Sequence, residues 1–261
     1  MDEKGIGLRN FDIKASVHDK KRGIHLPNRI TSDLAYLCGV LAGDGCIIKK
    51  EYRIICVGNP RDEIEFYDFI ISSLFKKIFN LDIKPQVFKY AGTYGIRFSS
   101  KLIALFLIEY IGLPHGKKYN KLCVPSLFKN DKKLFISYLS GLFDTDFGFT
   151  LKKDYFGIKR YPAVCFTTKS KKFCFEIYTS FRKLGMNPNK VYKCSYVHKK
   201  TNKEYFWYRF DLPWKTNFLL LNKILRYRHP KHIKKLKEWT KINKGNLEII
   251  KFLRENCPQA V

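Results

Sequence analysis

The feature that most constrains this chain is an internal repeat. Residues 36–45 read Tyr-Leu-Cys-Gly-Val-Leu-Ala-Gly-Asp-Gly, and residues 138–147 read Tyr-Leu-Ser-Gly-Leu-Phe-Asp-Thr-Asp-Phe. The two segments match in phase, so that Tyr36 corresponds to Tyr138 and Asp44 to Asp146. A chain with two in-phase copies of one segment is predicted to fold as two related halves.

The residues that follow each copy predict the same series of elements. After the first copy we expect strands at 46–50 and 52–57, a helix at 62–79, strands at 86–90 and 94–99, and a helix at 101–111. After the second copy we expect strands at 149–153 and 163–167, a helix at 170–184, strands at 191–199 and 205–211, and a helix at 215–227. Each half therefore reads α-β-β-α-β-β-α. This order predicts an α+β fold with two pseudo-symmetric repeats, each an antiparallel four-stranded sheet with helices on one face.

The segments between and around the repeats are basic. The predicted organisation is a basic N-terminal extension at 1–32, a first repeat at 33–114, a lysine-rich linker at 115–133, a second repeat at 134–227 and a basic helical tail at 228–261. Pro230 marks a break in the chain before the tail.

The charge of the chain indicates its class of partner. Fifty Lys and Arg residues against 23 Asp and Glu residues leave a net charge of +27, and 22 Phe with 16 Tyr are enough to build a core. Such an excess predicts a polyanionic partner. No apolar run approaches the roughly 20 residues of a membrane span, and no secretory signal is visible, so we expect a cytoplasmic protein without a membrane partner. The eight cysteines include no Cys-x-x-Cys pair and are expected to be buried free thiols.

Each copy of the repeat predicts a helix with an unusual glycine. Ser32 or Asp33 is a suitable N-cap for the first helix. A glycine inside a helix costs about 1 kcal/mol relative to alanine, which is reasonable where another backbone comes very close. We therefore expect Gly39 and Gly141 to face each other where the two repeated helices pack.

Both repeated helices end in a carboxylate. Asp44 and Asp146 fall in the last turns, where the negative end of the helix dipole makes a carboxylate unfavourable, so a cation should compensate. A hard divalent ion, bound by the carboxylates and by backbone oxygens such as those of Gly43 and Thr145, is the natural candidate. The alternative is that both aspartates are solvated helix ends.

The two segments resemble the signature helices of the LAGLIDADG (dodecapeptide) homing endonucleases, in the monomeric two-repeat form. The resemblance covers about residues 26–240. It implies Mg²⁺-dependent hydrolysis, with Mn²⁺ as a substitute, of both strands of a long, imperfectly palindromic DNA target. It also implies that Asp44 and Asp146 are the acidic metal ligands and catalytic residues, and that the sheets lie in the major groove of double-stranded DNA. Phe147 departs from the family pattern, in which glycine is usual, and Asp144 is expected to be structural or capping.

The resemblance also implies a basic residue at the start of the helix after the fourth strand of each repeat. By position these catalytic residues are Lys101 and Lys215. A polar residue near the end of the second strand is expected in the pocket, where Asn59 and Thr168 or Lys169 fit. Arg97 and Arg209 lie beside the core-facing Phe98 and Phe210, so their side chains should point to DNA. The further DNA-binding candidates are Lys49, Arg53, Gln86, Lys89, Lys152, Lys193, His198 and Lys199.

A second function is compatible with the same residues. A protein of this lineage could keep the basic sheets and serve as an RNA-splicing maturase or a non-cleaving DNA-binding protein. Retention of both aspartates favours the endonuclease, and Phe147 favours the alternative.

Overall fold

The structure is a computed structural model that describes residues 6, 7, 13–119 and 121–243. Residues 244–261 of the helical tail predicted at 228–261, and residues 1–5 and 8–12 of the N-terminal extension, lie outside the described residues. The chain divides into two compact units. The first contains Met1–Lys118, Val124–Thr145 and Tyr227–Pro230, and the second contains Tyr119–Cys123, Asp146–Arg226 and Lys231–Val261.

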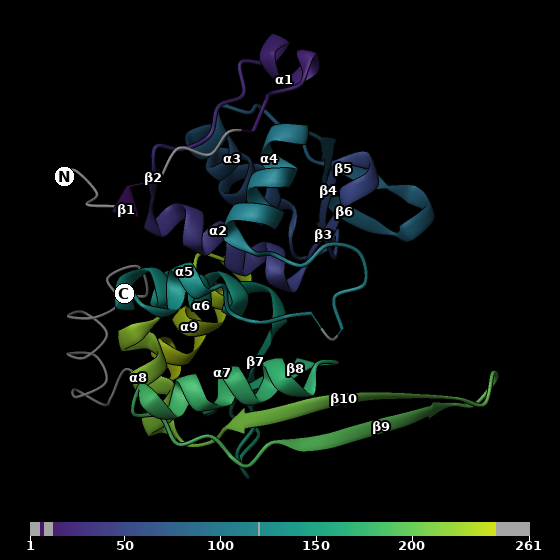
Figure 1. Ribbon diagram of the computed structural model, residues 1–261. Helices are drawn as coiled ribbons and strands as arrows, with labels where there is room; N and C mark the ends of the chain where they lie inside the picture. Colours follow the sequence, from purple (N-terminus) through teal and green to yellow (C-terminus); the bar gives the residue numbers. More distant parts are fainter. Residues whose placement is uncertain (1–5, 8–12, 120, 244–261) are drawn as a thin grey trace. The chain divides into compact units, whose positions relative to one another are not determined.

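The first unit is built around an antiparallel sheet with the strand order β3-β4-β6-β5 (Figure 1). Its strands are β3 Gly45–Ile48, β4 Arg53–Gly58, β5 Gln86–Phe88 and β6 Thr93–Ser99. Its principal helices are α2 Ser32–Gly43, η2 Phe66–Ile71, α3 Ser72–Phe79, α4 Lys101–Leu105, η4 Phe106–Ile111 and α6 Lys132–Asp146. The shorter elements are β1 Ile6–Gly7, α1 Val17–Lys21, β2 Arg29–Ile30, η1 Lys49–Glu51, η3 Lys89–Ala91 and α5 Ser126–Lys129.

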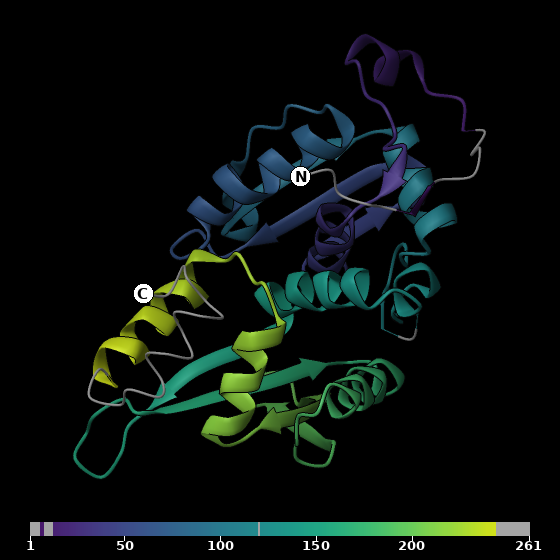
Figure 2. The ribbon, with the colours of Figure 1, turned by 90° about the vertical axis from the view of Figure 1, so that its left-hand side faces the viewer.

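The second unit repeats this sheet with the order β7-β8-β10-β9. Its elements are β7 Phe147–Lys152, β8 Tyr161–Thr168, α7 Lys171–Lys183, β9 Tyr192–His198, β10 Lys203–Leu212, α8 Lys215–Ile224 and α9 Pro230–Ile242. Helix α9 lies beside the loop between β7 and β8 (Figure 2), where Lys159 pairs with Glu238 at 3.1 Å and the Trp239 indole donates to the Arg160 carbonyl at 2.9 Å.

Alternation along the strands gives each sheet one buried face. In the first unit Ile54 and Phe98 lie opposite each other in the register and are buried, whereas Arg97, the next residue along β6, is exposed. In the second unit Phe166 and Phe210 are likewise paired and buried. Side chains two apart on a strand share a face, so the other face of each sheet is available for contacts.

The predicted α+β fold with two antiparallel four-stranded sheets is confirmed, and the elements occur in the expected order. The predicted helix at 101–111 is present as α4 followed by η4, which is a stretch of wider, π-helical turns. The predicted helix at 62–79 is present as a similar π-helical stretch, η2, followed by α3. The compact units do not follow the repeat boundaries, because α6 up to Thr145 groups with the first unit.

Two smaller features complete the fold. The seven cysteines of the described residues are free thiols, three of them fully buried and four partly exposed. Burial raises the pKa of the Cys174 thiol to about 12. Among the described residues no helix is both long and apolar enough to cross a membrane.

Candidate active site and nucleic-acid interface

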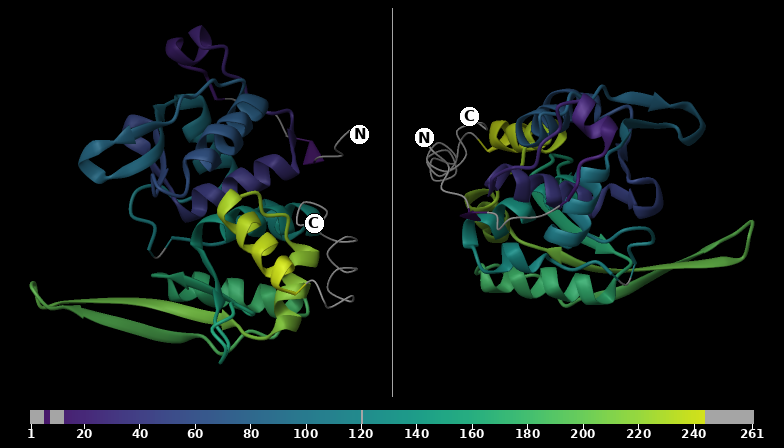
Figure 3. Two further views of the ribbon diagram at one scale, coloured as in Figure 1. Left: turned by 180° about the vertical axis from the view of Figure 1, so that it is seen from behind. Right: turned by 45° about the horizontal axis from the view of Figure 1, so that its top comes forward.

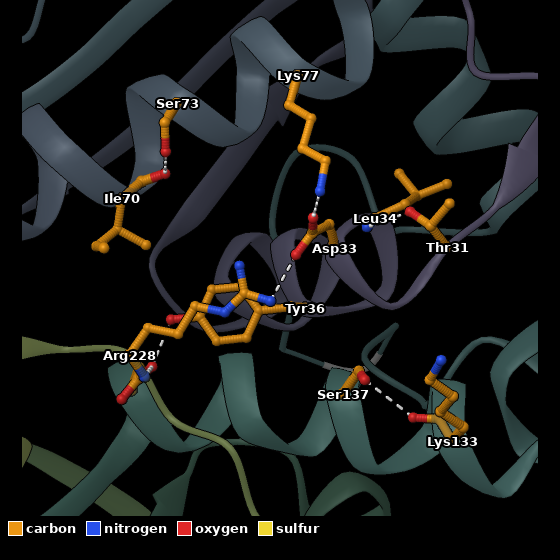
Figure 4. Close-up of polar contacts among 11 residues, drawn as sticks. Thr31, Asp33, Leu34, Tyr36, Ile70, Ser73, Lys77, Lys133, Ser137 and Arg228 are labelled. Atoms are coloured by element: carbon orange, nitrogen blue, oxygen red, sulfur yellow. Dashed lines mark hydrogen bonds and ion pairs between the residues drawn. The ribbon is translucent and has the colours of Figure 1, made fainter. Parts of the chain in front are cut away.

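Helix α2 is buried over nearly its whole length, and its N-cap lies one residue before the first of the expected caps. The Thr31 hydroxyl accepts the Leu34 backbone N–H at 3.2 Å, so Thr31 is the N-cap and the predicted Ser32 or Asp33 is not. The Asp33 carboxylate instead accepts from Lys77 Nζ at 2.6 Å and from Arg228 Nη2 at 2.5 Å (Figure 4). The local sequence suggests that Asp33 is a capping residue, but its carboxylate binds Lys77 and Arg228, which are distant in the chain.

These contacts hold the start of α2 in place electrostatically. Burial alone would raise the pKa of Asp33, but the hydrogen bonds and charges of Lys77 and Arg228 outweigh it and lower the pKa. The Arg228 guanidinium also lies 4.3 Å from the centre of the Tyr36 ring (Figure 4). Residues far apart in the chain thus fix the first turns of α2.

Asp144 takes part in the same network from α6. Its side chain is fully buried and accepts a short hydrogen bond from the Tyr36 hydroxyl and another from the Arg228 backbone N–H at 2.7 Å. Burial and the neighbouring Asp144 carboxylate raise the pKa of Tyr36 well above its ordinary value. Asp144 therefore has the structural role expected for it, and it does not cap a helix.

Helices α2 and α6 cross at the two glycines. A Cβ atom on Gly39 would lie 2.0 Å from the Tyr138 carbonyl oxygen, and one on Gly141 would lie 2.0 Å from the Tyr36 carbonyl oxygen. No side chain tolerates such a separation, so each helix crosses the other where the residue must be glycine. The close backbone approach expected from the sequence is present.

A lysine that the sequence analysis did not select lies at the end of α2. Asp44 is the C-cap, with its backbone N–H donating to the Val40 carbonyl at 3.0 Å. Lys118 Nζ donates to the Ala42 carbonyl at 2.9 Å and to the Gly43 carbonyl at 2.6 Å. An ammonium group thus occupies the negative end of the helix dipole, where a cation was expected.

The buried Cys56 thiol responds to the same charges. Burial raises the pKa of Cys56, and the Asp44 and Glu63 carboxylates raise it further, whereas Lys118 lowers it. Asp44 and Lys118 therefore both lie within electrostatic range of one buried side chain. The end of α2 combines a carboxylate, two carbonyl oxygens and a cation.

The end of α6 has different neighbours. The Thr145 hydroxyl donates within the helix, to the Gly141 carbonyl at 3.3 Å and the Leu142 carbonyl at 3.1 Å. Asp146 is the last helical residue and is partly exposed. Phe147, which follows it, is 4% exposed and packs on Phe166 with ring centres 4.7 Å apart. The departure at Phe147 thus contributes to the core of the second sheet.

The predicted catalytic lysines and pocket residues occupy the expected elements. Lys101 and Lys215 are the first residues of α4 and α8. Asn59 follows β4 and its Oδ1 accepts the Arg61 backbone N–H at 2.9 Å, whereas Thr168 ends β8. Lys169 Nζ lies 4.8 Å from the centre of the Tyr119 ring. Among the described residues, the lysine that donates hydrogen bonds to the carbonyls at the end of α2 is Lys118 and not Lys101.

The predicted DNA-binding residues of the first unit gather on the open face and at the ends of its sheet. Arg97 is exposed and its guanidinium lies 4.5 Å from the centre of the Phe88 ring. Arg53 pairs with Glu51 at 2.7 Å, and Lys49 pairs with Glu109 at 3.0 Å. The remaining two, Gln86 and Lys89, are exposed.

On the second sheet the charge of one predicted DNA-binding residue, Arg209, is partly neutralised by a neighbouring carboxylate. Arg209 Nη2 donates to Asp211 Oδ1 at 2.5 Å, and the Tyr192 hydroxyl donates to Asp211 Oδ2 at 2.6 Å. Burial would raise the pKa of Asp211, but these two hydrogen bonds outweigh it and lower the pKa. The exposed candidates are Lys152, Lys193 and Lys199, and His198 is partly exposed.

Sequence reasoning missed Lys118, Arg228 and Tyr36. Lys118 is one of several lysines in the linker, and no local pattern singles it out. Arg228 falls in the predicted tail, yet the structure assigns it to the first unit. Nor do the described residues contain a group of three or more His, Cys, Asp or Glu side chains placed to hold a metal ion.

Two antiparallel four-stranded sheets of this order, with a glycine-crossed helix pair, form an α+β fold that is consistent with a two-repeat LAGLIDADG fold, and a solved structure shares it. The structure of I-DmoI in complex with DNA and Ca aligns with a TM-score of 0.51 at 17% sequence identity, covering 79% of this chain and 97% of that chain. This chain therefore shares the fold of I-DmoI. No protein-family model matches the sequence, and no curated protein sequence matches it.

Two further matches have lower scores. The LAGLIDADG homing endonuclease I-GzeII in complex with a DNA target aligns with a TM-score of 0.43 at 10% identity, covering 87% of this chain and 96% of that chain. Full-length DUF199/WhiA from Thermatoga maritima aligns with a TM-score of 0.46 at 14% identity, covering 87% of this chain and 67% of that chain.

Proposed function

We propose that this chain is a monomeric, site-specific endonuclease that uses a divalent metal to hydrolyse both strands of a DNA duplex. The observation that carries the proposal is the pair of glycine-crossed helices, α2 and α6, each ending in an aspartate. A net charge of +27 and open sheet faces with exposed basic residues support double-stranded DNA as the substrate.

The end of each repeated helix carries oxygen donors of the kind that a hard cation prefers. Asp44 and Asp146 offer carboxylate oxygens, and Gly43 offers a carbonyl oxygen that already accepts from an ammonium group at 2.6 Å. Oxygen donors of this kind suit Mg²⁺, with Mn²⁺ as a substitute. When bound, the metal would activate water and compensate the charge on the leaving oxygen.

The remaining residues act as a positively charged frame. We assign to Lys118 the role sought for Lys101, because its ammonium lies beside the end of α2 and can stabilise charge that develops on a phosphate. Arg53 and Arg97 on the first sheet, and Lys152 and Lys193 on the second, would hold the duplex by its backbone and base edges.

The experiment is cleavage of a randomised duplex library with Mg²⁺, comparing the wild type with Asp44→Asn and Asp146→Asn. We expect enriched cuts that need a divalent ion and fall at least 100-fold in each variant. The matched control is Asp62→Asn, which changes an exposed aspartate outside the site and should cut like the wild type. Tight binding of duplex DNA without cutting under Mg²⁺ or Mn²⁺ would overturn the endonuclease.

The second candidate is a non-cleaving DNA-binding protein or an RNA-splicing maturase. The specific observation in its favour is that the two helix ends differ, with Phe147 buried where the first repeat has Gly45. The same library experiment separates the two, since this candidate predicts binding that survives Asp44→Asn and Asp146→Asn.

A further inference from the structure

The two sheets differ most in the length of their outer hairpins. Strand β10 runs five residues, Lys203–Trp207, past its last pairing with β8 at Tyr208, and these residues pair with β9 alone. Strand β6 runs one residue, Thr93, past its last pairing with β4. The second unit therefore carries a two-stranded ribbon that projects beyond its sheet, as both views of Figure 3 show.

This ribbon exposes aromatic and apolar side chains on both faces. Tyr196 is paired with Tyr205 on one face, and Phe206 lies on the other. Their side chains are 52%, 39% and 45% exposed. A two-stranded hairpin is marginally stable alone in water, so a ribbon of this length with open aromatic faces is expected to gain contacts from a partner.

The charge of the ribbon identifies that partner as a polyanion. Residues 190–208 contain five lysines against one acidic residue, Glu204. Lys193 lies 4.8 Å from the Phe206 ring centre and Lys203 lies 5.5 Å from the Tyr205 ring centre, so the cations cover the rings. Cationic groups held against aromatic rings suit a phosphate backbone better than an apolar protein surface.

The direction of the ribbon relates it to the open face of the second sheet. Tyr205, Trp207 and the DNA-binding candidate Arg209 lie on the face of β10 opposite the buried Phe210, and His198, which pairs with Lys203, shares that face. Lys193 pairs with Tyr208 and lies on the other face. A two-stranded ribbon fits the major groove of B-DNA. The ribbon can therefore continue into the groove along which its sheet lies.

We infer that the β9–β10 ribbon gives the second unit a longer DNA half-site than the first. This inference rests on the proposed DNA-binding function. The overhangs of five residues and one residue differ by four, or about 13 Å of strand at about 3.3 Å per residue, which spans about four base pairs. The protected duplex is thus asymmetric, with about four extra base pairs on one side.

The test is hydroxyl-radical footprinting of the full chain on a duplex selected by the wild type from a random library, with Ca²⁺ as the added ion. The variant deletes Ser195–His198 and Lys203–Phe206, which leaves the Cys194–Trp207 pair beneath the turn and keeps the alternation of faces. We expect one edge of the footprint to retreat by about four base pairs while the other edge stays in place. As a control, a Lys89→Gln change at the tip of the first unit's hairpin should leave in place the footprint edge that retreats in the deletion variant.

A second variant keeps the ribbon intact and removes its charge. Lys199→Gln, Lys200→Gln and Lys203→Gln together should lower the slope of log K against log salt by up to about 2.7, at about 0.9 per lost phosphate contact. The control changes Lys171, Lys172 and Lys183 to Gln on α7, which packs against the same sheet from its helical side. Equal loss in both sets would overturn the assignment of the ribbon.

The outcomes separate this inference from the proposed function. A symmetric wild-type footprint, or wild-type edges in the shortened variant, overturns the ribbon alone and leaves DNA binding in place. Failure of the wild type to select any duplex overturns both. Preference of the ribbon for single-stranded RNA, seen as a salt slope that changes with RNA and not with duplex, also overturns the inference.

Discussion

The two repeated helices end in the same carboxylate but in different surroundings. After Asp44 the chain has Gly45, where a Cβ would lie 2.4 Å from the Leu41 carbonyl oxygen, so no side chain fits without a shift of the backbone. After Asp146 the chain has Phe147, whose ring fills the core of the second sheet. Lys118 contacts the end of α2.

This difference shows which part of the repeat is fixed by the helix crossing and which by each unit. The glycines are equivalent because each meets the carbonyl of the other helix at the same separation. The residues after the aspartates are not equivalent, because each enters the core of a separate sheet. The comparison therefore predicts equal effects at the crossing and unequal effects beyond it.

The largest expected effect tests the equal part. Gly39→Ala and Gly141→Ala should each lower the free energy of unfolding by about 4 kcal/mol or more, because the new Cβ would lie 2.0 Å from a backbone oxygen. Denaturant unfolding of the two variants measures it. Gly92→Asn is the control, since Gly92 has open space around it and asparagine tolerates its positive φ. A large loss at one glycine and none at the other would break the equivalence.

The next effect tests the unequal part. Phe147→Gly should cost about 4 kcal/mol of unfolding free energy, because it removes a buried ring and adds backbone freedom. Phe147→Leu should cost about 1 kcal/mol, because most of the volume is kept. Thermal and denaturant unfolding check both. If Phe147→Gly proves neutral in stability, the phenyl ring is not a core residue and the difference between the helix ends disappears.

The next prediction tests whether Lys118, which contacts the end of α2, contributes to catalysis. Under the proposed function, Lys118→Met should lower the cleavage rate about 100-fold, since it removes a positive charge beside the end of α2. Single-turnover cleavage with saturating protein measures the rate, and a filter-binding assay on the same duplex should show little change. The control is Lys117→Met, which alters the neighbouring exposed lysine. A wild-type rate in Lys118→Met would return the role to Lys101.

The smallest effect concerns pH at the other end of α2. The hydrogen bonds from Lys77 and Arg228 lower the folded pKa of Asp33, so the unfolded state takes up the proton first and stability falls as pH drops below about 4. Asp33→Asn should lower stability by about 1 kcal/mol at pH 7 and flatten the decline between pH 4 and 2. Unfolding curves at several pH values test it; a decline as steep as that of the wild type would contradict the assignment.

The sequence was sufficient for the features that depend on local pattern. Alternation predicted that Phe98 would be buried and Arg97 exposed, and the in-phase copies predicted the order of the elements. The close approach at Gly39 and Gly141 followed from the cost of glycine in a helix.

The rest depends on contacts between distant residues, for which the sequence carries no local signal. The Lys118 ammonium donates to backbone carbonyls, which every residue has, so the sequence does not indicate this contact. Asp33 resembles an N-cap until two distant cations are placed beside it. Phe147 departs from the motif, and only the packing of its ring on Phe166 explains why.

The place of Tyr227–Pro230 has a consequence for synthesis on the ribosome. Tyr227 and His229 are buried and Arg228 binds Asp33, all within the first unit. All four strands of the second sheet must therefore leave the ribosome before Tyr227–Pro230 can pack into the first unit. The second unit in turn includes residues from Lys231 onward, among them those of α9, so neither unit is complete until the last part of the chain has been made.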